Sequence, residues 1–423
     1  MRILIATSHR NISGGVEKYL QQILPSLAAR GHQLALLYEY RFNPTAERVD
    51  VELDLPSCGT QESGEAAGLS FVRQWKPDVV YSQGLESAHL QSALLNEYPT
   101  VLYAHNYVGT CISGEKCHRF PIRRPCDRQF GPACLALFYP RRCGGLHPGT
   151  MWNLYQRATE RNAQLQRYAA ILVASGHMRR EFMRHGVTSD QIHVMALPNL
   201  RQVDPLQAAV HASARPAVRA DGPANLLFLG RLTKLKGAAE LLHAIPLAEK
   251  KLGRPLALTI AGDGPERQHL QQLAQRSASQ VSFPGWMGSG QIAKLIAGSD
   301  LLVVPSLWPE PFGLVGIEAG SSGLPAVAYD VGGISDWLVA GYSGEIAPGN
   351  PPTIEGLAEA IARALSDPAH YSMLSRGARE VAARFTLAVH LSKLENILET
   401  VWERIPRTPA VTARGEETIH ADV

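Results

Sequence analysis

Two glutamates with seven residues between them, Glu310 and Glu318, form the spacing with the clearest chemical meaning. Pro311 and Gly313 keep Glu310 out of a helix interior, and a helix is predicted to begin near Gly313. The free N–H groups and positive dipole end of such a helix suit a diphosphate. The flanking carboxylates would then accept hydrogen bonds from hydroxyl groups on either side of that anion. The alternative is a surface loop whose acids are merely solvated.

Two cations follow the apolar run 226–229, in the turn that opens with Gly230. Arg231 can grip phosphate oxygens with two parallel hydrogen bonds, and Lys236 supplies a point charge. Ligands of parallel α/β sheets bind at the carboxyl ends of the strands. Because Arg231, Lys236 and Glu310 each follow a predicted strand, one cleft can hold all three. For this segment alone, an ordinary strand-to-helix turn with exposed cations is the alternative.

Other polar and glycine positions also fall at predicted strand ends. Gly14 and Gly15 follow the first strand and let the backbone approach a ligand. Gly262 and Gly285 follow strands in the second half of the chain and could line a nucleoside pocket, although each also suits an ordinary turn. His105 follows another apolar run and could hydrogen-bond a sugar, although a single histidine is more often structural.

Short continuous apolar runs alternate with helical patterns along most of the chain, which indicates parallel strands buried on both faces. The predicted strands form two series, 3–6, 34–37, 79–82, 101–104, 171–174 and 193–195, then 226–229, 257–261, 281–283, 301–304 and 326–328. Between the series, residues 201–223 have no clear period and indicate a linker. The fold class expected is therefore α/β, with two Rossmann-like, doubly wound parallel-sheet domains facing a cleft.

The bulk composition is that of an ordinary globular protein. A chain of 423 residues exceeds what one hydrophobic core usually supports, which favours two domains. A formal net charge of +3 gives no indication of nucleic-acid binding. The first apolar run is too short for a signal peptide, and no run approaches the length of a membrane span. We therefore expect a cytoplasmic protein, held at most on the inner face of a membrane.

In the motifs described above, the sequence resembles the retaining glycosyltransferases of family 4, which have the GT-B fold. The resemblance runs over nearly the whole chain. Its most specific parts are Gly230-Arg231 with Lys236-Gly237 and the motif from Glu310 to Glu318, and residues 261–265 and 197–199 also follow the family pattern.

The resemblance implies an acceptor-side domain over residues 1–200 and a nucleotide-sugar-binding domain over 224–386. The helix expected over 387–404 would cross back onto the first domain. The remaining residues, 405–423, are polar and contain proline, which predicts a disordered tail.

The resemblance also implies roles for the site residues. Arg231 and Lys236 would hold the donor diphosphate and stabilise the charge of the leaving group, without a catalytic metal or other cofactor. Glu310 would contact the donor sugar, Glu318 the nucleotide ribose, and His105 would reach the sugar from the opposite domain. Backbone contacts would come from Gly14, Gly15, Phe312, Gly313 and Leu314. Transfer with retention would pass through an oxocarbenium-like state, because no carboxylate is an obvious covalent nucleophile.

One segment, residues 106–150, does not follow from the fold and is expected to form an insert on the acceptor side. It holds five of the six cysteines. Clustered thiols in a cytosolic protein favour a structural zinc site, with Cys117, Cys126, Cys134 and Cys143 as candidate ligands. Disulfides, which would need an oxidising compartment, and free buried thiols are the alternatives.

The same segment is strongly basic, with seven basic residues against two acidic ones between 111 and 143. This charge fits an acceptor that carries phosphate, such as a lipid diphosphate, or an anionic membrane surface. A solvated basic loop is the alternative.

The predicted function is therefore transfer of a sugar from a nucleotide-diphosphate sugar to a glycan, a lipid-linked acceptor or a small molecule. The motif from Glu310 to Glu318 disfavours an epimerase, and a phosphorylase would bring a pyridoxal-phosphate lysine pocket that we do not find. The alternative from another class is a degenerate GT-B protein that senses metal or redox state through its cysteine-rich insert. The intact Arg231, Lys236 and both glutamates count against that alternative.

Overall fold

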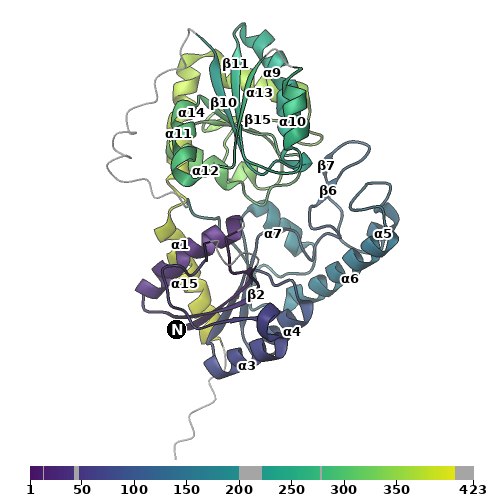
Figure 1. Cartoon of the computed structure of the whole chain (residues 1–423), viewed down its shortest axis with the longest axis vertical. Helices are drawn as coiled ribbons and strands as arrows, with labels where there is room; N and C mark the ends of the chain where they lie inside the picture. Colours follow the sequence, from purple (N-terminus) through teal and green to yellow (C-terminus); the bar gives the residue numbers. More distant parts are fainter. Residues whose placement is uncertain (13, 42–46, 200–221, 277–278, 405–423) are drawn as a thin grey trace, which may run out of the picture.

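The structure is a computed structural model that describes residues 1–12, 14–41, 47–199, 222–276 and 279–404. Two parallel sheets, each covered by helices, form two domains placed one above the other in Figure 1. The predicted α/β fold with two doubly wound domains is therefore confirmed. Nearly all of the predicted linker, and the whole of the predicted tail, lie outside the described residues.

The first sheet has the order β3-β2-β1-β4-β5-β8-β9, and every strand pair in it is parallel. The central strands are continuous runs of Ile, Leu and Val, because helices bury both of their faces. Its strands are β1 Arg2–His9, β2 Gln33–Tyr40, β3 Ser57–Gly59, β4 Val79–Ser82, β5 Thr100–Ala104, β8 Ala170–Val173 and β9 Ile192–Val194. The helices of this domain are α1 Gly15–Ala29, α2 Thr60–Ser63, α3 Glu65–Trp75, α4 Ala88–Glu97, α6 Pro148–Gln164, η1 Leu165–Arg167 and α7 Gly176–Met183.

The second sheet has the order β12-β11-β10-β13-β14-β15 and is also parallel throughout. Its strands are β10 Ala224–Leu229, β11 Leu256–Ala261, β12 Gln280–Gly285, β13 Leu301–Val304, β14 Ala326–Tyr329 and β15 Gly344–Ala347. Its helices are η2 Lys234–Lys236, α9 Ala238–Leu252, α10 Arg267–Ala274, α11 Ser289–Gly298, α12 Leu314–Ser321, η3 Ile334–Asp336, α13 Ile354–Ser366 and α14 Pro368–Ala382.

The last described helix, α15 Leu387–Glu403, returns to the first domain (Figure 1). Leu391, Leu394 and Leu398 join the apolar core beneath the first sheet. His390 adds polar contacts, because its Nδ1–H donates to the carbonyl of Ala196 at 3.0 Å and its Nε2 accepts from the hydroxyl of Tyr19 at 2.8 Å. Burial lowers the pKa of His390 to about 4, so its ring is neutral at pH 7.

The segment between β5 and α6 contains the hairpin of β6 Cys117–His118 and β7 Arg124–Pro125, followed by α5 Ala133–Leu137. A buried ion pair fixes it to the first domain. The ammonium of Lys116 lies 2.5 Å from the carboxylate of Glu181 on α7, and each side chain is nearly inaccessible. Lys116 also donates to the carbonyls of Thr110 and Arg128. Such a buried pair is stable only when its hydrogen bonds are satisfied.

Candidate active site

The carboxyl ends of the strands in the second sheet bring three predicted glycine turns together. The Gly230 N–H donates to Ala261 at 3.1 Å, and the Gly262 N–H donates to Gly285 at 2.8 Å. Gly262 has a φ of +147°, and a Cβ there would lie 1.9 Å from the Gly230 carbonyl oxygen. Only glycine therefore allows the turns after β10 and β11 to approach this closely.

Glu310 is a buried carboxylate on this edge, with an exposed fraction of 4%. Its Oε1 accepts hydrogen bonds from the Lys236 ammonium at 2.6 Å, the Ser306 hydroxyl at 2.5 Å and the Trp308 indole N–H at 3.0 Å. The loops after β10 and β13 meet through the Leu307 N–H, which donates to Leu235 at 2.8 Å. These contacts hold one carboxylate and one ammonium in a fixed relation before any ligand arrives.

Arg231 and Glu318 lie on the same edge with less restraint. Arg231 follows β10 and its side chain is exposed, so its guanidinium is accessible to a ligand. Glu318 is half-buried in the second turn of α12. The sequence predicts Arg231 at a strand end and Glu318 within the first two turns of the next helix; Arg231 lies directly after β10, and Glu318 lies on α12.

The helix α12 begins at Leu314, next to the predicted start at Gly313. Gly313 has a φ of +96° and turns the chain into the helix. Phe312 is buried, and its carbonyl accepts from the Trp337 indole N–H at 2.6 Å. The aromatic ring of Phe312 thus belongs to the core, and only its backbone can contribute to a site.

His105 lies across from this edge, at the carboxyl end of β5 in the first domain. Its Nε2 contacts the Gln83 side-chain oxygen at 2.8 Å, so this nitrogen carries the proton and Nδ1 is an acceptor. Burial lowers the pKa of His105 to about 3. A neutral ring can hydrogen-bond a hydroxyl group, but it cannot supply a proton near pH 7.

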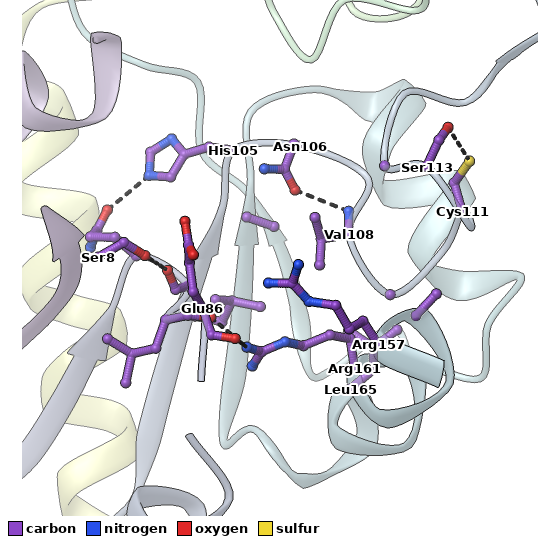
Figure 2. Close-up of a pocket in the computed structure, with 18 of the residues that line it drawn as sticks. Ser8, Glu86, His105, Asn106, Val108, Cys111, Ser113, Arg157, Arg161 and Leu165 are labelled. Atoms are coloured by element: carbon purple, nitrogen blue, oxygen red, sulfur yellow. Dashed lines mark hydrogen bonds between the residues drawn. The ribbon is translucent and has the colours of Figure 1, made fainter. Parts of the chain in front are cut away.

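A cavity of about 350 Å³ opens beside His105 in the first domain (Figure 2). Figure 2 shows Arg157 and Arg161 reaching toward it from α6, opposite His105 and Asn106. Arg161 donates to the carbonyls of Leu85 at 2.5 Å and Glu86 at 2.6 Å, which holds it in the wall. The sequence does not predict α6 as part of a site, because its arginines belong to none of the motifs found and follow the insert in an ordinary helical pattern.

Several contacts join the first domain to the second, and three of them lie near the residues predicted for the site. The Gly176 N–H donates to the Asp336 carboxylate at 2.8 Å. The rings of Tyr107 and Trp308 meet edge to face at 6.4 Å. The Lys18 ammonium lies 5.5 Å from the centre of the Trp286 ring. The last contact brings the start of α1, where Gly14 and Gly15 are exposed, toward the turn at Gly285.

The predicted zinc ligands Cys117, Cys126, Cys134 and Cys143 do not form a metal site. In the described ranges, no three His, Cys, Asp or Glu side chains are grouped so that they could hold a metal ion. All six cysteines are free, so no disulfide is present either. The alternative of free, partly buried thiols is the one that the geometry supports.

The physical reason is the orientation and burial of the thiols. The Cys117 thiol lies within hydrogen-bond distance of two backbone carbonyls, that of His118 at 3.3 Å and that of Leu307 in the second domain at 3.5 Å. Burial raises the pKa of Cys117 and Cys143 to about 12, and the neighbouring thiols of Cys111, Cys126 and Cys134 contribute to the shift at Cys143. With no metal bound, these two thiols are therefore protonated near pH 7.

Two family models match successive parts of the chain. The one described as "Glycosyltransferase Family 4" matches residues 13–197, and "Glycosyl transferases group 1" matches residues 212–381. The chain belongs to glycosyltransferase family 4. The residues that carry its most specific motifs lie in the second matched region.

Two curated family relatives illustrate the range of similarity. Glycogen synthase of Mycobacterium tuberculosis is 32% identical over 45% of this chain and 47% of its own length, so the chain spans about half of that relative. Alpha-D-kanosaminyltransferase of Streptomyces kanamyceticus is 28% identical over 65% of this chain and 72% of its own length.

Solved structures agree on the GT-B fold. HepE of Anabaena, solved in complex with UDP and glucose, is 19% identical with a TM-score of 0.66, over 95% of this chain and 100% of that one. Sucrose-phosphate synthase of Thermosynechococcus elongatus is 19% identical with a TM-score of 0.68. The match covers 95% of this chain and 99% of that one. Among the described helices of this family 4 member, none has the length and apolar character needed to cross a membrane.

Proposed function

We propose that this protein is a retaining glycosyltransferase that moves a sugar from a nucleoside-diphosphate sugar to an acceptor, without a catalytic metal. The observation that carries the proposal is the ion pair of Lys236 and Glu310 on the edge where α12 begins. An ammonium, an exposed guanidinium and a helix N-terminus together supply positive charge where a diphosphate leaving group would develop negative charge.

In this proposal the donor diphosphate lies against Arg231, Lys236 and the first N–H groups of α12. Lys236 then turns from Glu310 to the diphosphate, and Glu310 accepts hydrogen bonds from the donor sugar. Glu318 holds the ribose, and the backbone at Gly230, Gly262 and Gly285 lines the nucleoside pocket. The cations stabilise the departing diphosphate while the anomeric carbon becomes oxocarbenium-like.

The acceptor is proposed to occupy the cavity beside His105 in the first domain. His105 would accept a hydrogen bond at Nδ1 from the donor sugar or from the attacking hydroxyl group. The departing diphosphate oxygen would take the acceptor proton, so transfer occurs on the face that the leaving group vacates. A glycan, a lipid-linked acceptor or a small molecule would each satisfy this arrangement.

A thermal-shift panel of nucleoside diphosphates and their sugars tests the donor site. UDP sugars come first, because HepE was solved with UDP and glucose. A ligand at a hundred times its Kd stabilises the folded state by about 2.7 kcal/mol. We expect such a shift in the wild-type protein, its loss in Lys236→Ala, and its retention in Lys234→Ala, an exposed lysine of the same turn. No shift with any nucleotide would overturn the donor assignment.

The stereochemistry is tested separately once a donor is known. Proton NMR of the first-formed glycoside reports the anomeric configuration directly. Retention of the donor configuration supports the proposed mechanism, and inversion contradicts it.

A further inference from the structure

A small cavity beside the insert is lined by three arginines and only one acidic side chain among the described residues. It measures about 220 Å³ and lies between the β6–β7 hairpin, α5 and the loop after β15. Arg124 lines it from β7, Arg128 from the next turn of chain, and Arg141 from the segment after α5. Figure 1 shows this hairpin beside the second domain.

The three arginines have no acidic partner in the part of the chain that the structure describes. Asp127 is the one acidic side chain among the described residues that line the cavity. Three positive charges against one negative charge leave an excess of two. Arg124 and Arg128 are exposed and Arg141 is half-buried, so water screens part of their mutual repulsion, and an anion bound between them would remove more of it. A phosphate group carries about 1.5 to 2 negative charges at pH 7, which matches the excess.

A buried histidine in the same cavity wall has an unsatisfied polar atom. His118 is 7% exposed, and its Nδ1 has no hydrogen-bond partner. Burial and the charges of Arg141, Arg124 and Arg128 lower its pKa, so the ring is neutral. A buried polar atom without a partner costs free energy, and a ligand oxygen carrying or accepting a proton would satisfy it.

We propose that this cavity binds the phosphate group of a phosphorylated ligand. The planar fork of arginine donates two parallel hydrogen bonds to phosphate oxygens, and three arginines line this one cavity. A ligand carboxylate carries a single negative charge and would neutralise only one of the two excess positive charges.

The position of the cavity connects it to both domains. His118 follows Cys117, whose thiol contacts Leu307 in the segment that leads to Glu310. Asn350 of the second domain also lines the cavity. A phosphate bound there would thus contact the insert and the second domain at once, beside the proposed active site. The phosphate site does not depend on the proposed sugar transfer and can be tested without it.

Isothermal titration of the full chain with inorganic phosphate, at constant ionic strength, tests the proposal. We expect saturable binding in the wild-type protein and about tenfold or greater weakening in Arg124→Gln/Arg141→Gln. Arg142→Gln is the matched control, because Arg142 adjoins Arg141 but lies over the Phe120 ring at 4.7 Å. The control should bind phosphate as the wild type does. Equal phosphate affinity in all three proteins, or none in the wild type, would refute the site.

Two further probes identify the source of the phosphate. Tighter binding of glycerol 3-phosphate than of inorganic phosphate would support a phosphorylated substrate, and equal binding would support free phosphate as the ligand. Binding to phosphatidylglycerol vesicles without any binding of either small phosphate would replace the proposal with a membrane-binding surface. The UDP thermal shift, measured on the same variants, should not change, which separates failure of this site from failure of the donor site.

Discussion

Replacement of Lys236 by methionine tests the proposed chemistry most directly. The change keeps much of the side-chain volume and removes the ammonium that lies 2.6 Å from Glu310. Removing one preorganised group that stabilises developing negative charge costs about 10²- to 10³-fold in kcat, or roughly 3 to 4 kcal/mol. We therefore expect turnover to fall by at least about a hundredfold.

The effect on folding should be smaller than the effect on turnover. Glu310 keeps its hydrogen bonds from Ser306 and Trp308, and the Lys236 side chain is 31% exposed, so solvent screens the lost pair. We expect a loss of about 1 to 2 kcal/mol in the free energy of unfolding. Urea unfolding measures this quantity, and far-UV circular dichroism checks that the fold is intact.

The assay is the initial rate of nucleoside-diphosphate release at saturating donor and acceptor, using the donor found in the thermal-shift panel. Lys234→Met, from the same turn, controls for the loss of one positive charge and should keep nearly full activity. The double variant Lys236→Met/Glu310→Gln should be little slower than the worse single variant, because the two side chains act as a unit. Turnover of Lys236→Met within about tenfold of the wild type would refute the proposed role of the ammonium.

Three further predictions concern stability. Because the pKa of His390 is lowered from 6.5 to about 4, the unfolded chain binds the proton first, so stability falls as the pH drops through that interval. Between pH 7 and pH 4, the free energy of unfolding of the wild type, measured with urea, should fall by on the order of 3 kcal/mol more than that of His390→Gln. An equal pH dependence in the two proteins would contradict this. Lys116→Met leaves the buried Glu181 carboxylate with Arg184, at 3.4 Å, as its remaining arginine partner and should cost up to about 3 to 5 kcal/mol, whereas Lys116→Met/Glu181→Gln should recover part of that loss in the same assay. Gly262→Ala forces a Cβ against the Gly230 carbonyl and should lower stability by about 1 to 3 kcal/mol and weaken the nucleotide thermal shift, and an unchanged melting temperature would refute the steric argument.

Most of the two sheets could be predicted from the sequence, because their central strands are buried on both faces and appear as continuous apolar runs. The predicted runs 3–6 and 301–304 lie within β1 and β13, for example. The strands that were missed, β3 and β15, lie at sheet edges and contain glycine and polar residues. An edge strand is paired on one side only, so its sequence carries less of the apolar pattern.

The site residues could be placed at strand ends, but their contacts with one another could not be predicted. The ion pair of Lys236 and Glu310 joins residues 74 positions apart and depends on how two loops approach. Lys116 belongs to a strongly basic segment that suggests a solvated loop, yet it is 2% exposed and paired with Glu181. Composition indicates that a segment is charged. Which of its charged side chains are buried depends on partners that lie far away in the sequence.

The anchoring of the insert has an evolutionary consequence. Lys116, which lies in the insert, neutralises Glu181 of α7, which belongs to the domain framework. Glu181 is 3% exposed while the insert covers it, and Arg184 is a second cation 3.4 Å from its carboxylate. A deletion of the insert would remove the Lys116 ammonium and open Glu181 to water, so the framework would lose a buried ion pair together with the packing that surrounds it. The insert, once acquired with its lysine, is kept by a requirement of the fold as well as by any ligand that it binds.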